Sequence, residues 1–373
     1  MATNSIPMPD GETGPQSVAA RPWVPVLAGD GIGREVTAEV QRLAEALVAA
    51  GAIDVAFEEL DWGAERYLAS GEAVPPGGFE RLRRAAAVLC GAFGDPRVPD
   101  HEHAREILLG MRAALDLYVN LRPVRCLDER LNPLRNVPAR DIDLVIVREN
   151  TEGLYCDMGG VLRAGTPHEV AVQEMLVTRH GVERVVRYAF EVAASRPKRV
   201  VTLVDKANAL RYAGAVWQRA FSDVAAGFPG VRAEHLYADA AAMLLVRDPA
   251  RFDVVVTDNL FGDILSEVAA ALQGGLGLAP SANLRPGGPA MFEPVHGSAP
   301  DLSGAGTANP MAALASFALL LRHLGHAALA GAVEGAIAGA VRDGETTPDL
   351  GGVSSTAEVG ASVRRRVLER VAA

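Results

Sequence analysis

The chain has 373 residues, more than one hydrophobic core usually serves, and this length suits two domains. Hydrophobic residues make up 49% of the chain and the formal net charge is −10, which allows a large core and argues against nucleic acid as the main partner. No apolar run is long enough to span a bilayer, and no secretory signal pattern opens the chain. We therefore expect neither a membrane partner nor export.

Two further features bear on where the folded part of the chain begins and on the cellular compartment of the protein. Residues 1–20 are rich in Pro, Gly, Ser and Thr without periodicity, which is typical of a disordered leader. The three cysteines, Cys90, Cys126 and Cys156, are odd in number and widely spaced. This suits a reducing compartment without a disulfide framework, so we expect a cytoplasmic protein.

Short β-rich runs alternate with longer helical stretches after the leader. In chain order, each expected strand is followed by an expected helix: 24–27 and 34–50, 86–90 and 105–118, 143–147 and 180–195, 200–204 and 209–226, 233–237 and 239–247, 254–257 and 262–273. This alternation predicts an α/β fold with a largely parallel sheet.

A glycine turn, Gly29-Asp30-Gly31-Ile32-Gly33, follows the first expected strand. It lacks the G-x-G-x-x-G spacing of the dinucleotide-binding fingerprint, so by itself it does not identify a nucleotide site.

Polar and charged residues follow four later strands within two residues of the strand end. They are Arg148-Glu149-Asn150, Asp205-Lys206-Ala207-Asn208, Asp239 and Asp258-Asn259. Ligands of α/β sheets bind at the carboxyl ends of the strands, so the sequence predicts a shared active site at that edge.

Asp263 and Glu267 stand four residues apart, on one face of a mostly apolar expected helix. An acidic helix face is usually only solvated, but two isolated carboxylates on an apolar helix suit Mg²⁺ or Mn²⁺, which take oxygen ligands. Asp239 is a plausible third ligand. No Cys or His cluster indicates zinc.

Only two of the 36 basic residues are lysines, Lys198 and Lys206. Arginine keeps its proton near neutral pH, whereas a lysine can exchange one, so each lysine is a candidate acid–base group. Lys198 lies in a polar connection between elements, where a solvated surface lysine is the favoured interpretation. This leaves Lys206 as the candidate. Arg112, Arg122 and Arg148 are candidate carboxylate binders, although a lone arginine in this Arg-rich chain more often lies at the surface.

The longer motifs resemble those of the isopropylmalate/isocitrate dehydrogenase family of β-decarboxylating dehydrogenases. Between about residues 24 and 352 they are LAGDGIG, MRAALDLYVNLRP, DLVIVRENTEGLY, VDKAN, FDVVVTDNLFGDILSE, GLGLAPSANL, FEPVHGSAPDLSGAGTANP and TPDLGG. The resemblance implies a non-Rossmann α/β fold with a cofactor-side domain (21–117 plus 275–373) and a dimerisation domain (118–274) bearing a β-arm. It also implies a homodimer with shared active sites, in which Lys206 and Asp239 serve the neighbouring subunit.

The resemblance assigns a role to each candidate by motif position. Arg112, Arg122, Arg148 and Asn208 would bind a hydroxy di- or tricarboxylate, Tyr155 would protonate C3, Lys206 would remove the hydroxyl proton, and Asp239, Asp263 and Glu267 would bind Mg²⁺ or Mn²⁺. NAD would be held by Asp301 at the adenosine ribose, by His296 and Asn309 beside the adenine, and by Gly297, Ser298 and Ala299 between them. Relatives that use NADP tend to carry Lys and Tyr in place of the acid.

Two departures concern the metal and the substrate. Isopropylmalate-type members usually carry Asp where this chain has Glu267. Arg105, Leu108 and Leu109 share a helix face with Arg112 and should face the C3 substituent. The leucine pair resembles isopropylmalate and tartrate/D-malate enzymes, yet isopropylmalate enzymes usually have an acid at the position of Arg105.

We therefore expect NAD- and metal-dependent oxidative decarboxylation of a 3-substituted (2R)-malate, first of all 3-isopropylmalate to 2-oxoisocaproate. One alternative is a D-malate or tartrate dehydrogenase. Another is an isocitrate- or homoisocitrate-like enzyme acting on a substrate whose C3 substituent carries a carboxylate or phosphonate. A non-catalytic regulatory subunit is disfavoured, because the lysine, the tyrosine and the metal carboxylates are all present.

Overall fold

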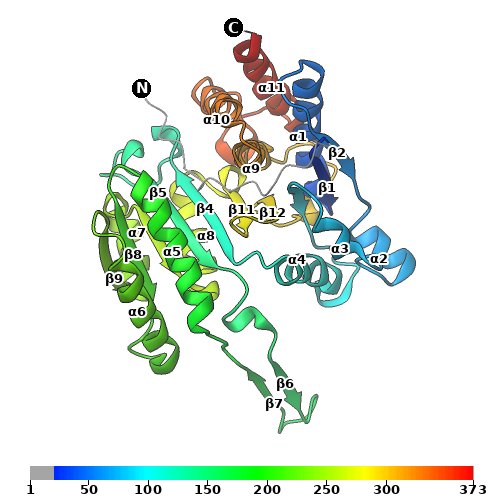
Figure 1. The fold of residues 1–373 in the computed structure, drawn as a ribbon. Helices are drawn as coiled ribbons and strands as arrows, with labels where there is room; N and C mark the ends of the chain where they lie inside the picture. Colours follow the sequence, from blue (N-terminus) through cyan, green and yellow to red (C-terminus); the bar gives the residue numbers. More distant parts are fainter. Residues whose placement is uncertain (1–20, 373) are drawn as a thin grey trace.

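The computed structural model describes residues 21–372 and is organised around one ten-stranded sheet (Figure 1). The strands of this sheet are β1 (Trp23–Gly29), β2 (Ala56–Glu59), β3 (Val88–Ala92), β4 (Val119–Arg125), β5 (Asp143–Glu149), β8 (Val200–Asp205), β9 (Arg232–Tyr237), β10 (Val254–Thr257), β11 (Pro280–Leu284) and β12 (Ala290–Pro294). The helices are α1 (Ile32–Ala49), α2 (Ala64–Ser70), α3 (Gly78–Leu82), α4 (Glu102–Ala114), α5 (Arg179–Ser195), α6 (Arg211–Ala225), α7 (Ala238–Arg247), α8 (Asn259–Leu272), α9 (Met311–His323), α10 (Ala327–Arg342) and α11 (Thr356–Ala372).

The strand order is β2-β1-β3-β12-β11-β4-β5-β10-β8-β9. Most neighbouring pairs are parallel, as the sequence predicted, and the antiparallel pairs all involve β4 or β11 at the centre. The first five strands in this order come from 21–117 and 275–373, and the last five from 118–274. The division into two domains along this boundary stays a prediction.

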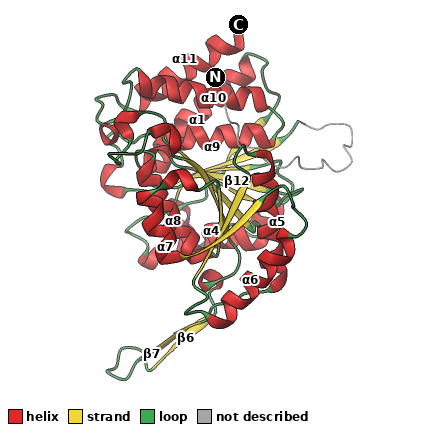
Figure 2. Cartoon of the chain, turned by 90° about the vertical axis from the view of Figure 1, so that its left-hand side faces the viewer, coloured by secondary structure: helices red, strands yellow, loops and turns green. Residues whose placement is uncertain are grey.

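The four strands with polar carboxyl ends, β5, β10, β8 and β9, are consecutive neighbours and all parallel. Their carboxyl ends therefore meet at one edge of the sheet. Buried side chains on both faces of β5, β8 and β10 explain their continuous apolar sequences, and helices cover both faces of the sheet (Figure 2). Helix α8 begins at this edge, because Asp258 accepts a hydrogen bond from the Phe261 N–H as its N-cap.

The predicted helix 105–118 was wrong at its carboxyl end. Helix α4 ends at Ala114, and Asp116 takes a left-handed φ of 52°, which turns the chain into β4. Strand β4 was not expected, because the helical pattern was carried past this turn. The predicted leader, residues 1–20, lies outside the described residues.

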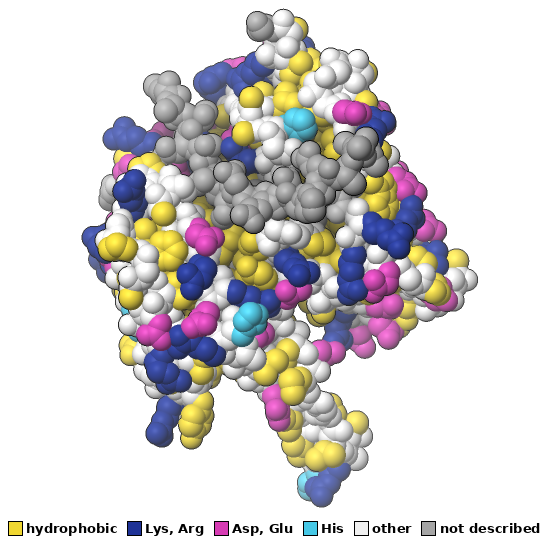
Figure 3. Space-filling model, in the orientation of Figure 1, with side chains coloured by type: hydrophobic (Ala, Val, Ile, Leu, Met, Phe, Trp, Pro, Cys, Tyr) yellow, Lys and Arg dark blue, Asp and Glu magenta, His cyan; other side chains and the backbone are white. Residues whose placement is uncertain are grey.

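A two-stranded hairpin, β6 (Gly159–Leu162) with β7 (Val170–Gln173), projects away from the rest of the chain (Figures 1 and 2). We call it the arm. Its side chains are exposed in the single chain, including Val161 at 55% and Leu162 at 67%, and hydrophobic atoms lie along its surface (Figure 3). An isolated hairpin of this length is marginally stable in water, so the arm needs a covering surface. No helix within 21–372 is long and apolar enough to cross a membrane.

Candidate active site

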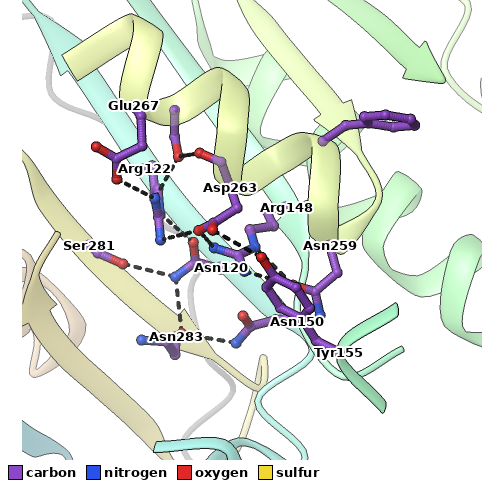
Figure 4. Close-up of polar contacts among 12 residues, drawn as sticks. Asn120, Arg122, Arg148, Asn150, Tyr155, Asn259, Asp263, Glu267, Ser281 and Asn283 are labelled. Carbon is purple, nitrogen blue, oxygen red and sulfur yellow. Dashed lines mark hydrogen bonds and ion pairs between the residues drawn. The ribbon is translucent and has the colours of Figure 1, made fainter. Parts of the chain in front are cut away.

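A ladder of buried amides and a hydroxyl crosses the centre of the sheet (Figure 4). Asn120 on β4 donates to Ser281 Oγ at 2.8 Å and to Asn283 Oδ1 at 3.0 Å, both on β11. Asn150, directly after β5, donates to the same Asn283 oxygen at 2.9 Å. Buried amides are costly unless they are hydrogen-bonded, and this mutual bonding fixes the positions of β4, β5 and β11 relative to one another.

Two arginines predicted from sequence stand on this ladder (Figure 4). Arg122 on β4 donates from Nε to Asn120 Oδ1 at 2.7 Å and from Nη1 to Ser266 Oγ at 2.5 Å. Arg148 on β5 is only 1% exposed, and both its Nε and its Nη2 donate to Asn259 Oδ1. Each guanidinium is therefore oriented by neutral acceptors, a geometry that suits the recognition of carboxylates.

The arginines of this cluster lie close enough together to repel one another. Burial, together with the positive charges of Arg122 and Arg112, lowers the pKa of Arg148 to about 9. Burial also lowers the pKa of Arg122. Both remain cations near neutral pH, and their mutual repulsion favours an incoming anion with several carboxylates.

Asp263 on α8 lies between the two arginines. Its Oδ1 pairs with Arg148 Nη1 and stands 3.5 Å from Arg122 Nη2, and its Oδ2 accepts a hydrogen bond from the Tyr155 hydroxyl at 3.2 Å. Glu267, one turn further along α8, has its Oε1 3.9 Å from Arg122 Nη1. Partial burial raises the pKa of Glu267. The two carboxylates thus face the same space, as their spacing predicted.

Tyr155 lies at the open side of the cluster. Its side chain is 37% exposed, and its ring is 5.5 Å from the Arg148 guanidinium carbon. Burial and the Asp263 carboxylate raise the pKa of its hydroxyl. The phenol is therefore protonated near neutral pH and can donate a proton.

Arg112 reaches the cluster from α4 on the other side. Its Nη2 is 3.4 Å from Oε1 of Glu293, a buried residue of β12 that also accepts from Asn283 at 2.8 Å. Glu293 was missed by sequence reasoning, as were Asn120, Ser281 and Asn283. Buried polar residues inside apolar strands, as in VNLRP and PSANL, were the signal that could have found them.

Lys206 and Asp239 form a separate pair at the next part of the same sheet edge. Lys206 Nζ is 2.7 Å from Asp239 Oδ1, and this bond lowers the pKa of the Asp239 carboxyl. Asp205 holds the loop by accepting from the Ala207 N–H and by bonding His235 Nε2 at 2.8 Å. Asn208, in the same loop, is exposed.

The three predicted metal ligands are not brought together in one chain. Within residues 21–372 no group of three or more His, Cys, Asp or Glu side chains is placed to hold a metal ion. Asp263 and Glu267 carry the oxygen donors that a hard cation prefers, and they lie on the same helix face, so they could form half of such a site. A further carboxylate would have to come from another chain.

Helix α4 presents the predicted specificity face. Leu108 packs partly against the hydrophobic core, Leu109 is half-buried, and Arg105 is exposed with its Nη2 3.2 Å from Asp157 Oδ1. The helix is fixed from below by the buried His103, whose Nε2 is 2.8 Å from Asp30 Oδ2. The glycine turn thus helps to position α4.

The glycine turn also supports the predicted cofactor loop. At Gly31 a Cβ atom would come within 2.1 Å of the Ser298 carbonyl oxygen, and the Ile32 N–H donates to that oxygen at 2.9 Å. Only glycine permits this approach, so the turn acts as a packing element and not as a nucleotide fingerprint.

The loop itself carries donors suited to a nucleotide. The Nε2 of His296 is buried and has no hydrogen-bond partner among the described residues, and burial lowers the pKa of this imidazole. Asn309 donates to Asp349 at 3.0 Å, which fixes its amide, while Gly297 and Asp301 are exposed and Ala299 is half-buried. A neutral His296 with a free ring nitrogen fits a base that offers a hydrogen-bond partner.

Comparison with known proteins identifies the family of this chain. Residues 23–363 match the model of the isocitrate/isopropylmalate dehydrogenase family. This chain belongs to that family. A 3-isopropylmalate dehydrogenase from Thermobifida fusca is 49% identical over 92% of this chain and 97% of its own length. One from Frankia casuarinae is 52% identical over 85% and 92%.

A solved structure supports the same relationship. An isocitrate dehydrogenase from Methylococcus capsulatus superposes with a TM-score of 0.84 at 34% identity, covering 93% of this chain and 99% of that one. The predicted family and α/β fold are thereby confirmed.

Proposed function

We propose that this chain, as a homodimer, oxidises and decarboxylates 3-isopropylmalate to 2-oxoisocaproate with NAD and a divalent cation. The observation that carries the proposal is the convergence of Arg112, Arg122 and Arg148 with Tyr155 and Asp263, in a chain about half identical to several 3-isopropylmalate dehydrogenases. Free cysteines in 21–372 fit a reducing cytoplasm, where we propose that the enzyme works.

The arginines would bind the malate part of the substrate. Arg122 and Arg148 already point toward Asp263. A substrate carboxylate would accept hydrogen bonds from the guanidinium N–H groups that now pair with Asp263. Arg112 would hold the second carboxylate from the α4 side. Because neutral acceptors orient Arg122 and Arg148, the substrate meets fixed donors and little ordering cost remains.

Asp263 and Glu267, with Asp239 of a second copy, would hold the cation, which would supply Lewis acidity toward the substrate, while bound NAD would supply the hydride acceptor. Lys206 of the second copy would take the hydroxyl proton, through water, as hydride leaves. When CO₂ is lost from C3, the electron pair stays on the substrate, and the Tyr155 hydroxyl would deliver a proton to C3. The raised pKa of Tyr155 keeps that proton available.

What the single chain lacks supports the proposed homodimer. Lys206 and Asp239 are paired with each other and lie apart from Asp263 and Glu267. Apolar side chains of α7 and α8 are exposed, including Met243 at 51% and Ile264 at 52%, as are those of the arm. A second copy would cover these surfaces and carry its Lys206 and Asp239 to the arginines.

Cofactor choice would rest on Asp301. Its exposed carboxylate fits the ribose hydroxyls of NAD and would repel the 2′-phosphate of NADP. Asn309, fixed by Asp349, and His296 would bracket the adenine.

Substrate choice would rest on Leu108 and Leu109, which offer apolar contact to an isopropyl group. The purified protein should reduce NAD with 3-isopropylmalate and Mn²⁺, measured by NADH absorbance, with a kcat/KM above those for D-malate, tartrate and isocitrate. A higher kcat/KM with any of the others would overturn the proposed substrate.

A further inference from the structure

A buried carboxylate in the glycine turn accepts hydrogen bonds from three other segments of the chain. Asp30 directly follows β1 and is 2% exposed. Its Oδ1 accepts a hydrogen bond at 2.8 Å from the N–H of Ala64, where α2 begins. Its Oδ2 accepts from the Gly94 N–H at 2.9 Å, just after β3, and bonds Nε2 of His103 on α4 at 2.8 Å. Asp30 therefore holds α2, α4 and the end of β3 against the glycine turn.

His103 supplies the side-chain donor of this set. An ionised carboxylate only accepts hydrogen bonds, so Nε2 carries the proton that it shares with Asp30. The ring is 0% exposed, and its Nδ1 has no hydrogen-bond partner among the described residues. Within residues 21–372 the bond to Asp30 is thus the one hydrogen bond that orients this ring.

The amino end of α4 has few other polar contacts. No side-chain cap is formed there within the described residues, and Asp100 and His101, directly before the helix, take left-handed φ values of 52° and 50°. The Tyr67 hydroxyl donates to Glu102 at 2.8 Å, but this contact lies at the surface. The bond from His103 is therefore the buried polar contact that fixes the first turn of α4.

The same carboxylate adjoins the loop that would hold NAD. Ile32, two residues after Asp30, donates its N–H to the Ser298 carbonyl oxygen at 2.9 Å. Gly94, which donates to Asp30, lies so close to Ser298 that a Cβ atom there would come within 3.1 Å of its Oγ. Asp30 thus connects the proposed cofactor loop with the helix that carries Arg112.

We propose that His103 is a positioning residue, which sets α4 against the cofactor loop so that a malate bound by Arg112 meets NAD in the geometry that hydride transfer needs. This inference rests on the proposed function and adds to it a residue that contacts neither substrate nor cofactor. A displacement of about 1 Å between reacting groups can cost roughly 10²-fold in rate. Loss of the bond should therefore slow hydride transfer while every group that binds or reacts is still present.

His103→Leu, which keeps an apolar side chain in place and removes the donor, tests this. The substrate is the 3-substituted malate that the wild-type dimer turns over best, used with hydrogen or deuterium at C2. We expect kcat/KM for the malate to fall about 10- to 100-fold. The deuterium isotope effect on kcat should rise, because hydride transfer would replace product release as the slow step. The Kd of NAD, measured by isothermal titration calorimetry, should change by less than about threefold, since the contacts of the cofactor loop remain.

Two further variants separate positioning from packing. His103→Gln places an amide N–H near the position of Nε2 and should keep kcat/KM within about threefold of the wild type. Tyr67→Phe removes the surface hydrogen bond to the same turn of α4 and should change neither kcat/KM nor the isotope effect. If His103→Leu does not form a folded dimer, His103→Asn takes its place, because the shorter amide cannot reach Asp30.

An unchanged isotope effect in the variant without the donor would overturn the proposal. Equal losses of kcat/KM in that variant and in His103→Gln would also overturn it, since His103 would then act through packing alone. A wild type that prefers another malate to 3-isopropylmalate would overturn only the proposed substrate, because the test uses the best substrate. Turnover of no malate would overturn both proposals.

Discussion

The two halves of the proposed catalytic machinery are built in opposite ways. Arg122 and Arg148 are buried, and neutral side chains of β4 and α8 orient them. Lys206 and Asp239 are at the surface and have mainly each other as partners, with Asp239 exposed. The first half is held in place within the single chain, whereas the second half, in the proposed homodimer, would be completed only by the other copy.

This difference follows from what each half must do. Carboxylate recognition benefits from donors that are fixed in advance, because ordering them on binding would cost free energy. A proton-exchanging lysine must instead reach its target, and an exposed ion pair such as Lys206 with Asp239 is weak and easily exchanged for new partners. A mutation in the first half should therefore impair the site of the mutated chain. A mutation in the second half should impair the site of the other chain in the proposed dimer.

The largest effect should come from Lys206→Met, which keeps the length of the side chain and removes the amine. We expect turnover to fall roughly 10²- to 10⁴-fold, the usual cost of losing one acid–base group, with the dimer still folded. Circular dichroism and size-exclusion chromatography report the fold and the dimer. Near-wild-type activity would remove Lys206 from the mechanism.

Mixing subunits would show in which chain Lys206 acts. Random reassembly of Lys206→Met with Asp263→Asn should restore about a quarter of wild-type activity, because half of the dimers are mixed and each has one complete site. If Lys206 served its own subunit, both sites of a mixed dimer would be defective and mixing would restore nothing.

Removing the metal ion or a metal carboxylate should have an effect as large as removing the Lys206 amine. Chelation should stop the reaction, and Mn²⁺ or Mg²⁺ should restore it, because both ions take oxygen ligands. Asp263→Asn should abolish turnover, whereas Glu267→Asp should be tolerated, since related enzymes carry Asp there. Turnover is measured by NADH absorbance and thermal unfolding serves as the control, because Asp263 also pairs with Arg148. Full activity in excess chelator would contradict the metal assignment.

The sequence revealed the reaction type more readily than the site that supports it. The polar ends of β5, β8, β9 and β10 and the spacing of Asp263 and Glu267 are local patterns, and the sheet order confirmed that the four strands are neighbours. The ladder of Asn120, Asn150 and Asn283 could not be predicted, because it joins strands whose adjacency depends on the central antiparallel pairing. Likewise, nothing local in the sequence paired His103 with Asp30.

The choice of cofactor should have a smaller effect on kcat/KM, and it concerns Asp301, which belongs to neither half. We expect kcat/KM to favour NAD over NADP by at least about tenfold, equivalent to roughly 1.4 kcal/mol. The exposure of Asp301 lowers the repulsion of a 2′-phosphate below the roughly 4 kcal/mol of a close charge pair at an effective dielectric near 20. Asp301→Asn should lower the ratio of kcat/KM with NAD to kcat/KM with NADP. A higher kcat/KM with NADP in the wild type would contradict the proposed role of Asp301.

The smallest effect is expected at Arg105, which stands beside the preorganised half without belonging to it. Its guanidinium is exposed and lies 3.2 Å from Asp157, so it has a partner away from Leu108 and Leu109. An exposed pair of this kind contributes little, and a long arginine side chain readily stays in solvent. If the C3 substituent is isopropyl, Arg105→Ala should therefore change kcat/KM by less than about threefold.

An anionic substituent would give the opposite result. Arg105 would then leave Asp157 for a charge-assisted hydrogen bond worth roughly 1.5 to 3 kcal/mol, and Arg105→Ala would cost about 10- to 150-fold. Comparing 3-isopropylmalate, D-malate and a 3-carboxyalkyl malate with wild type and Arg105→Ala separates these cases, and Asp157→Ala is the matched control that frees Arg105 without removing it. A wild-type preference for the anionic substrate that is lost in Arg105→Ala and kept in Asp157→Ala would replace the proposed substrate. It would leave the proposed roles of the arginines, Tyr155 and Lys206 unchanged, because those residues would act on the malate part that all these substrates share.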